Sequence, residues 1–107
     1  MSVFDCVHGR PAEGVTVHVE GQTGRTWREI LHGRTDERGQ FSAQQGDSKL
    51  GYGIYRFELD VDHYYATQGI EPIFPRVILV LRIDDPAEWH YVPLLITPHA
   101  YVAYRAT

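Results

Sequence analysis

Alternating apolar and polar residues recur along most of the chain, a pattern typical of β-strands with one buried face. Val15–Glu20 and Gly53–Val61 show it most clearly, because every second side chain in each is large and apolar. Seven strands are predicted in this way: these two, and others at Ser2–Asp5, Thr26–Leu31, Arg76–Ile83 and, as a pair, within Trp89–Thr107. Arg76–Ile83 is a continuous β-branched run, so we expect it to be buried on both faces. The pattern indicates an all-β protein.

Asp60–Gln68 is the one segment with helical signals. Asp60 or Asp62 can accept hydrogen bonds from the first helical amides, and Gly69 can end the helix. The adjacent tyrosines, Tyr64–Tyr65, are expected to pack inward. The sequence therefore predicts a single short helix among the strands.

The carboxyl-terminal segment Trp89–Thr107 reads as a hairpin whose strands meet at a turn around Pro98. Alternation places one set of its first-strand residues on one face (Trp89, Tyr91, Pro93, Leu95) and a second set on the other (His90, Val92, Leu94, Ile96). Both faces are largely apolar, which is unusual for a strand at the surface. Either the hairpin is covered on both sides within one domain, or one face meets another copy of the chain, and for a chain of this length we favour the second.

Composition narrows the classes of partner. A chain of 107 residues with 43% hydrophobic residues is expected to form one domain, 1–107, with a small core. Its net charge of −4, without a cluster of basic residues, argues against nucleic acid and anionic membranes. The longest apolar run, Val77–Leu81, is too short to span a bilayer, and no signal peptide is visible. With a single cysteine, Cys6, the sequence predicts a cytoplasmic location.

Specific motifs extend from one end of the chain to the other. They are Asp5 with Gly9-Arg10-Pro11-Ala12, then Thr35-Asp36-Glu37-Arg38-Gly39, Gly53-Ile54-Tyr55, Gly69-Ile70-Glu71-Pro72, Tyr91-Val92-Pro93-Leu94-Leu95 and the terminal Tyr104-Arg105-Ala106-Thr107. In this order they resemble the transthyretin-like proteins, the family of 5-hydroxyisourate hydrolases and vertebrate transthyretin. The resemblance implies an antiparallel, eight-stranded β-sandwich with one short helix, and an eighth strand near Gln40–Ser42. It also implies a homotetramer, a dimer of dimers, with ligand channels at the dimer–dimer interface.

The residues at the catalytic positions of the hydrolases differ in this chain. Those enzymes resemble one another in a His before the first Leu-Asp, an Arg after the loop Gly, and a His before Val-Pro. The matching positions here are Ser2, Gln40 and Tyr91. Activation of the water needs a base whose pKa is near neutral, and the developing negative charge needs a cation. These three side chains do not supply either group in the same way, so we expect little of the family's usual reaction.

Other side chains at the implied channel still form a chemically useful set. We assign catalytic roles to Tyr91, Tyr104 and Arg105, with the tyrosines transferring protons and Arg105 as the cation. The expected substrate-binding residues are Ser2, Phe4, Gln40, Pro93, Leu95, Val102 and Thr107. An aromatic wall with one cation suits a flat ligand that is anionic or carbonyl-rich. The same tyrosines could instead only pack the interface.

Six histidines are present, at positions 8, 18, 32, 63, 90 and 99, but none forms a metal-binding spacing. The sequence therefore predicts no metal and no cofactor. His8 is expected to make a hydrogen bond within its turn. His90 is the one histidine that could replace a lost catalytic base, but it should face away from the channel unless a bulge turns it.

Three functions stay open. The first is a diverged enzyme acting on a small cyclic or carbonyl-rich substrate. The second is a non-catalytic small-molecule-binding protein. The third is a 5-hydroxyisourate hydrolase of urate catabolism with a rebuilt site that uses His90. Of these we favour the first.

Overall fold

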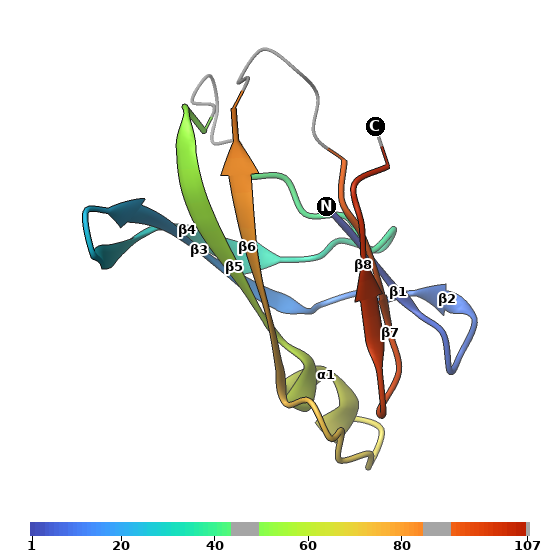
Figure 1. The fold of residues 1–107 in the computed structure, drawn as a ribbon. Coiled ribbons are helices and arrows are strands. Elements are labelled where there is room, and N and C mark those ends of the chain that lie inside the picture. Colours follow the sequence, from blue (N-terminus) through green and yellow to red (C-terminus); the bar gives the residue numbers. More distant parts are fainter. Residues whose placement is uncertain (44–49, 85–90, 107) are drawn as a thin grey trace.

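The computed structural model describes residues 1–43, 50–84 and 91–106, which form two four-stranded sheets and one short helix (Figure 1). The first sheet has the order β2-β1-β7-β8, and the second has the order β4-β3-β5-β6. The strands are β1 (Ser2–Asp5), β2 (Arg10–Pro11), β3 (Thr16–Thr23), β4 (Thr26–Arg34), β5 (Gly53–Asp60), β6 (Arg76–Ile83), β7 (Pro93–Ile96) and β8 (Tyr101–Ala103), and the helix is α1 (Val61–Ala66). This is the predicted all-β, eight-stranded sandwich.

All strand pairs are antiparallel except β1 and β7, which run parallel. The eighth strand is not at Gln40–Ser42 as expected. It is β2, whose residues Pro11 and Arg10 pair with Phe4 and Asp5 of β1. Gln40 forms only an isolated bridge to Ser2. The two segments share one flank of a four-residue β1, so neither has room for a longer ladder.

The alternating strands bury their apolar side chains between the two sheets. Val17 and Val19 of β3 are fully buried, as is Leu59 of β5, and β1 and β7 contribute Val3 and Leu94 from the opposite sheet. Burial of apolar surface from both sheets is the main stabilising term of such a sandwich.

β6 differs from its sequence-based expectation. Within one chain it is an edge strand, and Ile78 and Val80 are 48% and 58% exposed while Val77 is buried. The expectation of burial on both faces is therefore wrong for the single chain. An apolar edge of this kind is normally covered in a folded protein.

Helix α1 forms as predicted at its amino end. Asp60 is the N-cap, and its side chain accepts a hydrogen bond from the His63 amide at 3.0 Å. Gly69 adopts φ 69°, a left-handed conformation that suits the turn after the helix. Tyr64 and Tyr65 are buried, so the helix presents both rings to the core.

Both tyrosine rings reach Asp5, a fully buried carboxylate at the end of β1. Tyr64 donates its hydroxyl to Oδ2 at 2.7 Å, and Tyr65 contacts Oδ1 at 3.4 Å. The amides of Val7 and His8 donate to Oδ1, and His8 Nδ1 lies 2.8 Å from Oδ2, which confirms the turn hydrogen bond expected for His8.

Burial alone would raise the pKa of Asp5, but the hydrogen bonds from Tyr64 and from His8 and Val7 outweigh it and lower the pKa. Burial and the bond to Asp5 raise the pKa of Tyr64 to about 12, so this hydroxyl remains a donor. Because the folded-state pKa of Asp5 is depressed, its stabilisation is present above the unfolded value near 3.8 and is lost as the pH falls through the lower folded value.

Asp5→Asn tests this network. The amide would turn a donor towards groups that now donate, so we expect a loss of about 1–3 kcal/mol in the free energy of unfolding at neutral pH. Urea denaturation of the wild-type protein and the variant from pH 7 into acid measures it, and the difference in the free energy of unfolding should shrink as the pH falls below the unfolded-state value near 3.8. Asp36 accepts the amides of Arg38 and Gln40 on the surface, so Asp36→Asn is the matched control. An equal loss in both variants contradicts a special role for the buried carboxylate.

Gly39 provides a second test. It has φ 73°, and an added Cβ would lie 2.3 Å from the Val3 carbonyl oxygen. Gly24 also has a positive φ, of 63°, but nothing lies within 4 Å of its Cβ position. Both alanine variants should suffer backbone strain of about 1–2 kcal/mol, and Gly39→Ala an additional loss from the clash. Thermal melting of the pair measures the difference, and equal melting temperatures would refute the clash.

Candidate functional site

The outward face of β1, β7 and β8, called here the hairpin face, carries a row of apolar side chains. Phe4 pairs with Leu95, and Leu95 pairs with Val102, so the row crosses all three strands. The neighbours Val3 and Leu94 are buried, whereas Phe4 and Val102 are 38% and 56% exposed. Alternation therefore places three of the four apolar residues predicted to bind a ligand on one surface.

A polar row lies beside the apolar one. Ser2 pairs with Pro93, and Tyr104 donates its amide to the Pro93 carbonyl at 3.3 Å. The Ser2 hydroxyl and the Tyr91 hydroxyl are 2.7 Å apart and share a hydrogen bond. Gln40 flanks Ser2 through its bridge. The positions that replace the family's catalytic residues thus lie together at one end of the hairpin face.

Pro93 contributes less than expected to this surface. It is buried in the single chain, although its partner Ser2 is only half-buried. Pro93 cannot donate a backbone hydrogen bond, so its role towards a ligand is limited to shape.

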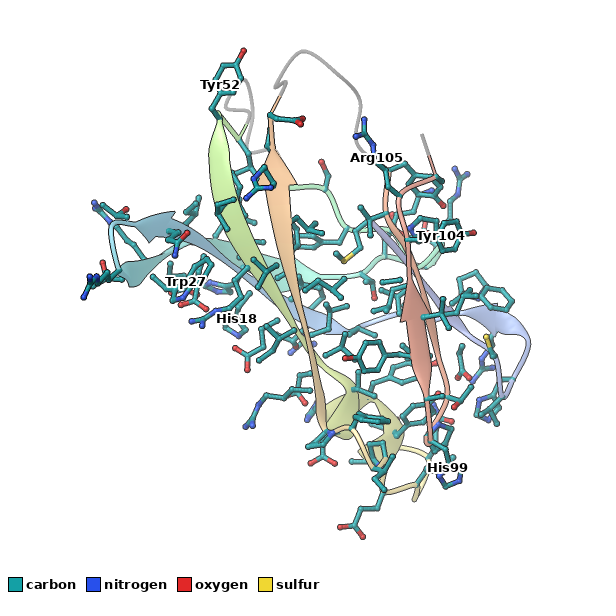
Figure 2. The ribbon with its side chains drawn as sticks, in the orientation of Figure 1. His18, Trp27, Tyr52, His99, Tyr104 and Arg105 are labelled. Carbon is teal, nitrogen blue, oxygen red and sulfur yellow. The ribbon has the colours of Figure 1, made fainter. Side chains whose placement is uncertain are left out.

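Arg105 and Tyr104 lie on opposite sides of the strand. Figure 2 shows the Tyr104 ring and the Arg105 guanidinium directed away from each other. The backbone explains this, because the Ala106 amide donates to the Tyr91 carbonyl at 2.9 Å and continues the β7–β8 pairing beyond β8. Successive side chains of an extended pair alternate between faces. Tyr104 therefore lies on the hairpin face with Pro93, and the Arg105 side chain leaves the backbone on the opposite face.

Two predicted participants fall outside the described residues. They are Thr107, predicted to bind substrate, and His90, the candidate replacement base. The hydroxyl pair, Gln40 and the apolar row are the parts of the predicted site that the structure brings together.

A concavity lies elsewhere on the molecule. A cavity of about 580 Å³ extends from the end of β2 to α1, and its lining mixes arginines (Arg10, Arg34) with glutamates (Glu13, Glu37). Because the lining carries charges of both signs, it does not indicate which class of ligand would bind there. The hairpin face is by contrast an open surface, so a second surface must cover it to enclose a ligand.

One group of side chains was missed by the sequence spacing. His18, Glu29 and His32 converge on the outer face of the other sheet, with potential ligand atoms within 4.8 Å of one another. The His18 and His32 positions face each other across β3 and β4. Cross-strand pairing, rather than a short sequence motif, is the signal that could have found them.

The two facing sheets, the short helix after β5 and the carboxyl-terminal hairpin together define a transthyretin-like β-sandwich. The model of the HIUase/Transthyretin family matches residues 1–106, so this chain belongs to that family. It is 28% identical over 105 residues to the 5-hydroxyisourate hydrolases of Salmonella dublin, Salmonella typhi and Salmonella typhimurium, which covers 98% of this chain and 77% of each relative. Among the described residues, no helix has the length and apolar character needed to cross a membrane.

Proposed function

We propose that this chain is a diverged enzyme that acts on a small cyclic or carbonyl-rich molecule at the hairpin face. The hydrogen bond between the Ser2 and Tyr91 hydroxyls, 2.7 Å long, is the observation that carries the proposal. It places two proton-exchanging groups beside the row of Phe4, Leu95 and Val102. An apolar wall with a few convergent polar groups is the usual form of a small-molecule site.

The hydroxyl pair can hold a carbonyl ligand in a defined orientation. When one hydroxyl donates to the other, the pair keeps one hydrogen that can point to a ligand oxygen. Tyr91 is proposed to polarise the substrate carbonyl and to transfer the proton, and Gln40 to add an amide donor or acceptor. Tyr104 extends the aromatic wall and offers a second hydroxyl. Arg105 is proposed as a cation at the rim that attracts an anionic substrate.

The arrangement of Tyr104 and Arg105 favours a second candidate, a non-catalytic binding protein. A cation on the opposite side of the strand is poorly placed to stabilise a charge that develops beside Tyr104 (Figure 2). The apolar row and the hydroxyl pair would still hold a flat ligand. If the protein shows no catalysis, the function we propose instead is binding of a ligand without turnover.

The proposed site requires assembly, and the exposed edges support it. β8 and β6 each form an edge of their sheet and carry exposed apolar side chains, including Val102 and Val80. Unpaired edges with such side chains readily pair with another chain. We propose a cytoplasmic homotetramer in which the hairpin faces of two copies enclose the ligand, without a metal or cofactor at that site.

The decay of freshly generated 5-hydroxyisourate, followed by ultraviolet absorbance, separates the enzyme hypotheses. We expect no acceleration by the protein, because Ser2, Gln40 and Tyr91 lack the usual base and cation. Acceleration that is lost in His90→Ala would instead establish a rebuilt hydroxyisourate hydrolase.

A panel of cyclic amides, imides and lactones then tests the proposed activity directly. Removing the proton-transferring hydroxyl in Tyr91→Phe should lower kcat/KM by on the order of 10²-fold. Tyr101→Phe is the matched control, because this ring packs edge-on against Phe74, with ring centroids 5.4 Å apart, outside the hydroxyl pair. Calorimetric binding without turnover selects the binding protein, and neither binding nor turnover overturns both candidates.

Leu95→Arg tests the assembly. Leu95 lies at the centre of the apolar row, so an arginine there would bury an unpaired charge between copies and dissociate the tetramer. Light scattering measures the mass. Tyr52→Arg is the control, because Tyr52 is 75% exposed and lies far from the hairpin (Figure 2). A Leu95→Arg variant that keeps the tetrameric mass contradicts the proposed interface.

A further inference from the structure

Two histidines and one glutamate form a compact cluster on the outer face of the β4-β3-β5-β6 sheet. His18 Nδ1 lies 3.0 Å from Glu29 Oε1, and His32 Nδ1 lies 3.5 Å from the same oxygen. The two imidazole rings stack with centroids 5.5 Å apart and an interplanar angle of 29°. All three side chains are accessible to solvent, with exposed fractions of 44%, 54% and 66% for His18, Glu29 and His32. An ion from solution can therefore reach the cluster.

A β-bulge in β4 places the glutamate there. The register runs from Val19↔Leu31 to Glu20↔Glu29, so Ile30 is the extra residue. Without it, two residues three apart, such as Glu29 and His32, would face opposite sides of the sheet. The inserted residue reverses the alternation, and both side chains then face outward. Bulges commonly re-aim side chains in this way next to functional sites.

The packing of Ile30 shows how the bulge is accommodated. A Cβ added to Gly21 would lie 2.8 Å from Ile30 Cδ1 and 3.5 Å from the Tyr55 ring. The Ile30 side chain therefore occupies the space that Gly21 leaves on the inner side of the sheet, beside buried Tyr55. The extra residue turns inward, and the carboxylate of its neighbour turns outward.

The donor atoms have the type and spacing that a transition-metal ion requires. Zinc binds imidazole nitrogen and carboxylate oxygen at about 2.0–2.2 Å, so neighbouring ligands of a tetrahedral ion lie about 3.3–3.6 Å apart. The distances of 3.0 and 3.5 Å from Glu29 Oε1 to the two Nδ1 atoms are close to that value. A bound ion would take the place of the protons that now lie between Glu29 and the two histidines. Two histidines and one glutamate leave a fourth position for water.

The neighbouring acidic residues have arginine partners of their own, which leaves the Glu29 carboxylate available to bind an ion. Glu58, opposite His18 on β5, is paired with Arg76 at 3.4 Å, and Glu20, opposite Glu29, is held by Arg56. The hydrogen bond from His18 lowers the pKa of Glu29, so its carboxylate is charged at neutral pH. The cluster combines two imidazole rings with one carboxylate.

We propose that His18, Glu29 and His32 form a binding site for one divalent transition-metal ion per chain, of the zinc class. Imidazole donors favour zinc, copper and nickel over magnesium and calcium. The site links β3 to β4 and lies on the opposite sheet from the hairpin face, so it is independent of the proposed small-molecule site. The ion is expected to bind the folded sandwich and to raise its melting temperature.

Zinc titration of the untagged, chelator-treated protein tests the proposal by isothermal calorimetry. We expect one ion per chain. Outer-sphere substitutions already weaken metal sites by about 10–100-fold, so loss of a direct ligand in His18→Ala, His32→Ala or Glu29→Gln should weaken binding at least about tenfold. His99→Ala removes an exposed histidine from the turn at the far end of the hairpin and should leave the affinity unchanged (Figure 2).

Nitrogen-detected NMR of the imidazoles identifies the ligands independently. Zinc should shift the Nδ1 resonances of His18 and His32 at one equivalent, with those of His63 and His99 unmoved. The three cluster variants should also lose the zinc-dependent rise in melting temperature. Unchanged affinity in all three variants, or zinc that first shifts His63 or His99, overturns the proposal. Circular dichroism confirms that each variant is folded, which the exposure of these side chains leads us to expect.

Discussion

The rest of this sandwich depends on one buried charge, the carboxylate of Asp5, which has no access to solvent. Moving a carboxylate out of water costs several kcal/mol, and a hydrogen bond to a charged group returns about 1.5–3 kcal/mol. One or two bonds would barely balance that cost. Asp5 has donors from its own turn and from α1, and the lowered pKa of the carboxyl shows that together they exceed the cost. The donors come from separate segments, so the Asp5 carboxylate links β1 to its own turn and to α1.

The position of β1 in turn determines the hairpin face. β1 is the neighbour of β7, and Cys6 donates its amide to the Ile96 carbonyl at 3.0 Å just beyond the last paired residue. Asp5 and Ile96 point inward in this register, so Phe4 and Leu95 must point outward. With the carboxylate buried, alternation alone therefore determines which side chains of β1 and β7 face outward.

Alternation also determined how much the sequence could predict. It located β3, β5 and the amino end of α1, because every second residue or a capping side chain carried the signal, whereas α1 ends at Ala66, before the predicted end at Gln68. It gathered Phe4, Leu95 and Val102 on one surface correctly. It could not reveal the bulge at Ile30, since one inserted residue reverses the faces without changing composition, and the histidine spacings gave no sign that Glu29 lies beside His18 and His32. The two-residue β2 was missed because so short a segment has no periodicity. Arg105 was assigned to the site with Tyr104 because the terminal Tyr104-Arg105 matches the family's motif, although alternation places these adjacent residues on opposite faces.

The pairing of β1 with β7 brings the two ends of the chain together. Ser2 contacts Tyr91 through its side chain, and Ala106 donates its amide to the backbone of the same tyrosine. A peptide attached just before Ser2 or just after Ala106 would therefore begin beside Tyr91. A purification tag, a fluorescent label or a fusion partner at such a position can occlude the hairpin face. Ligand binding and assembly measured on tagged protein would then report the attachment as well as the molecule.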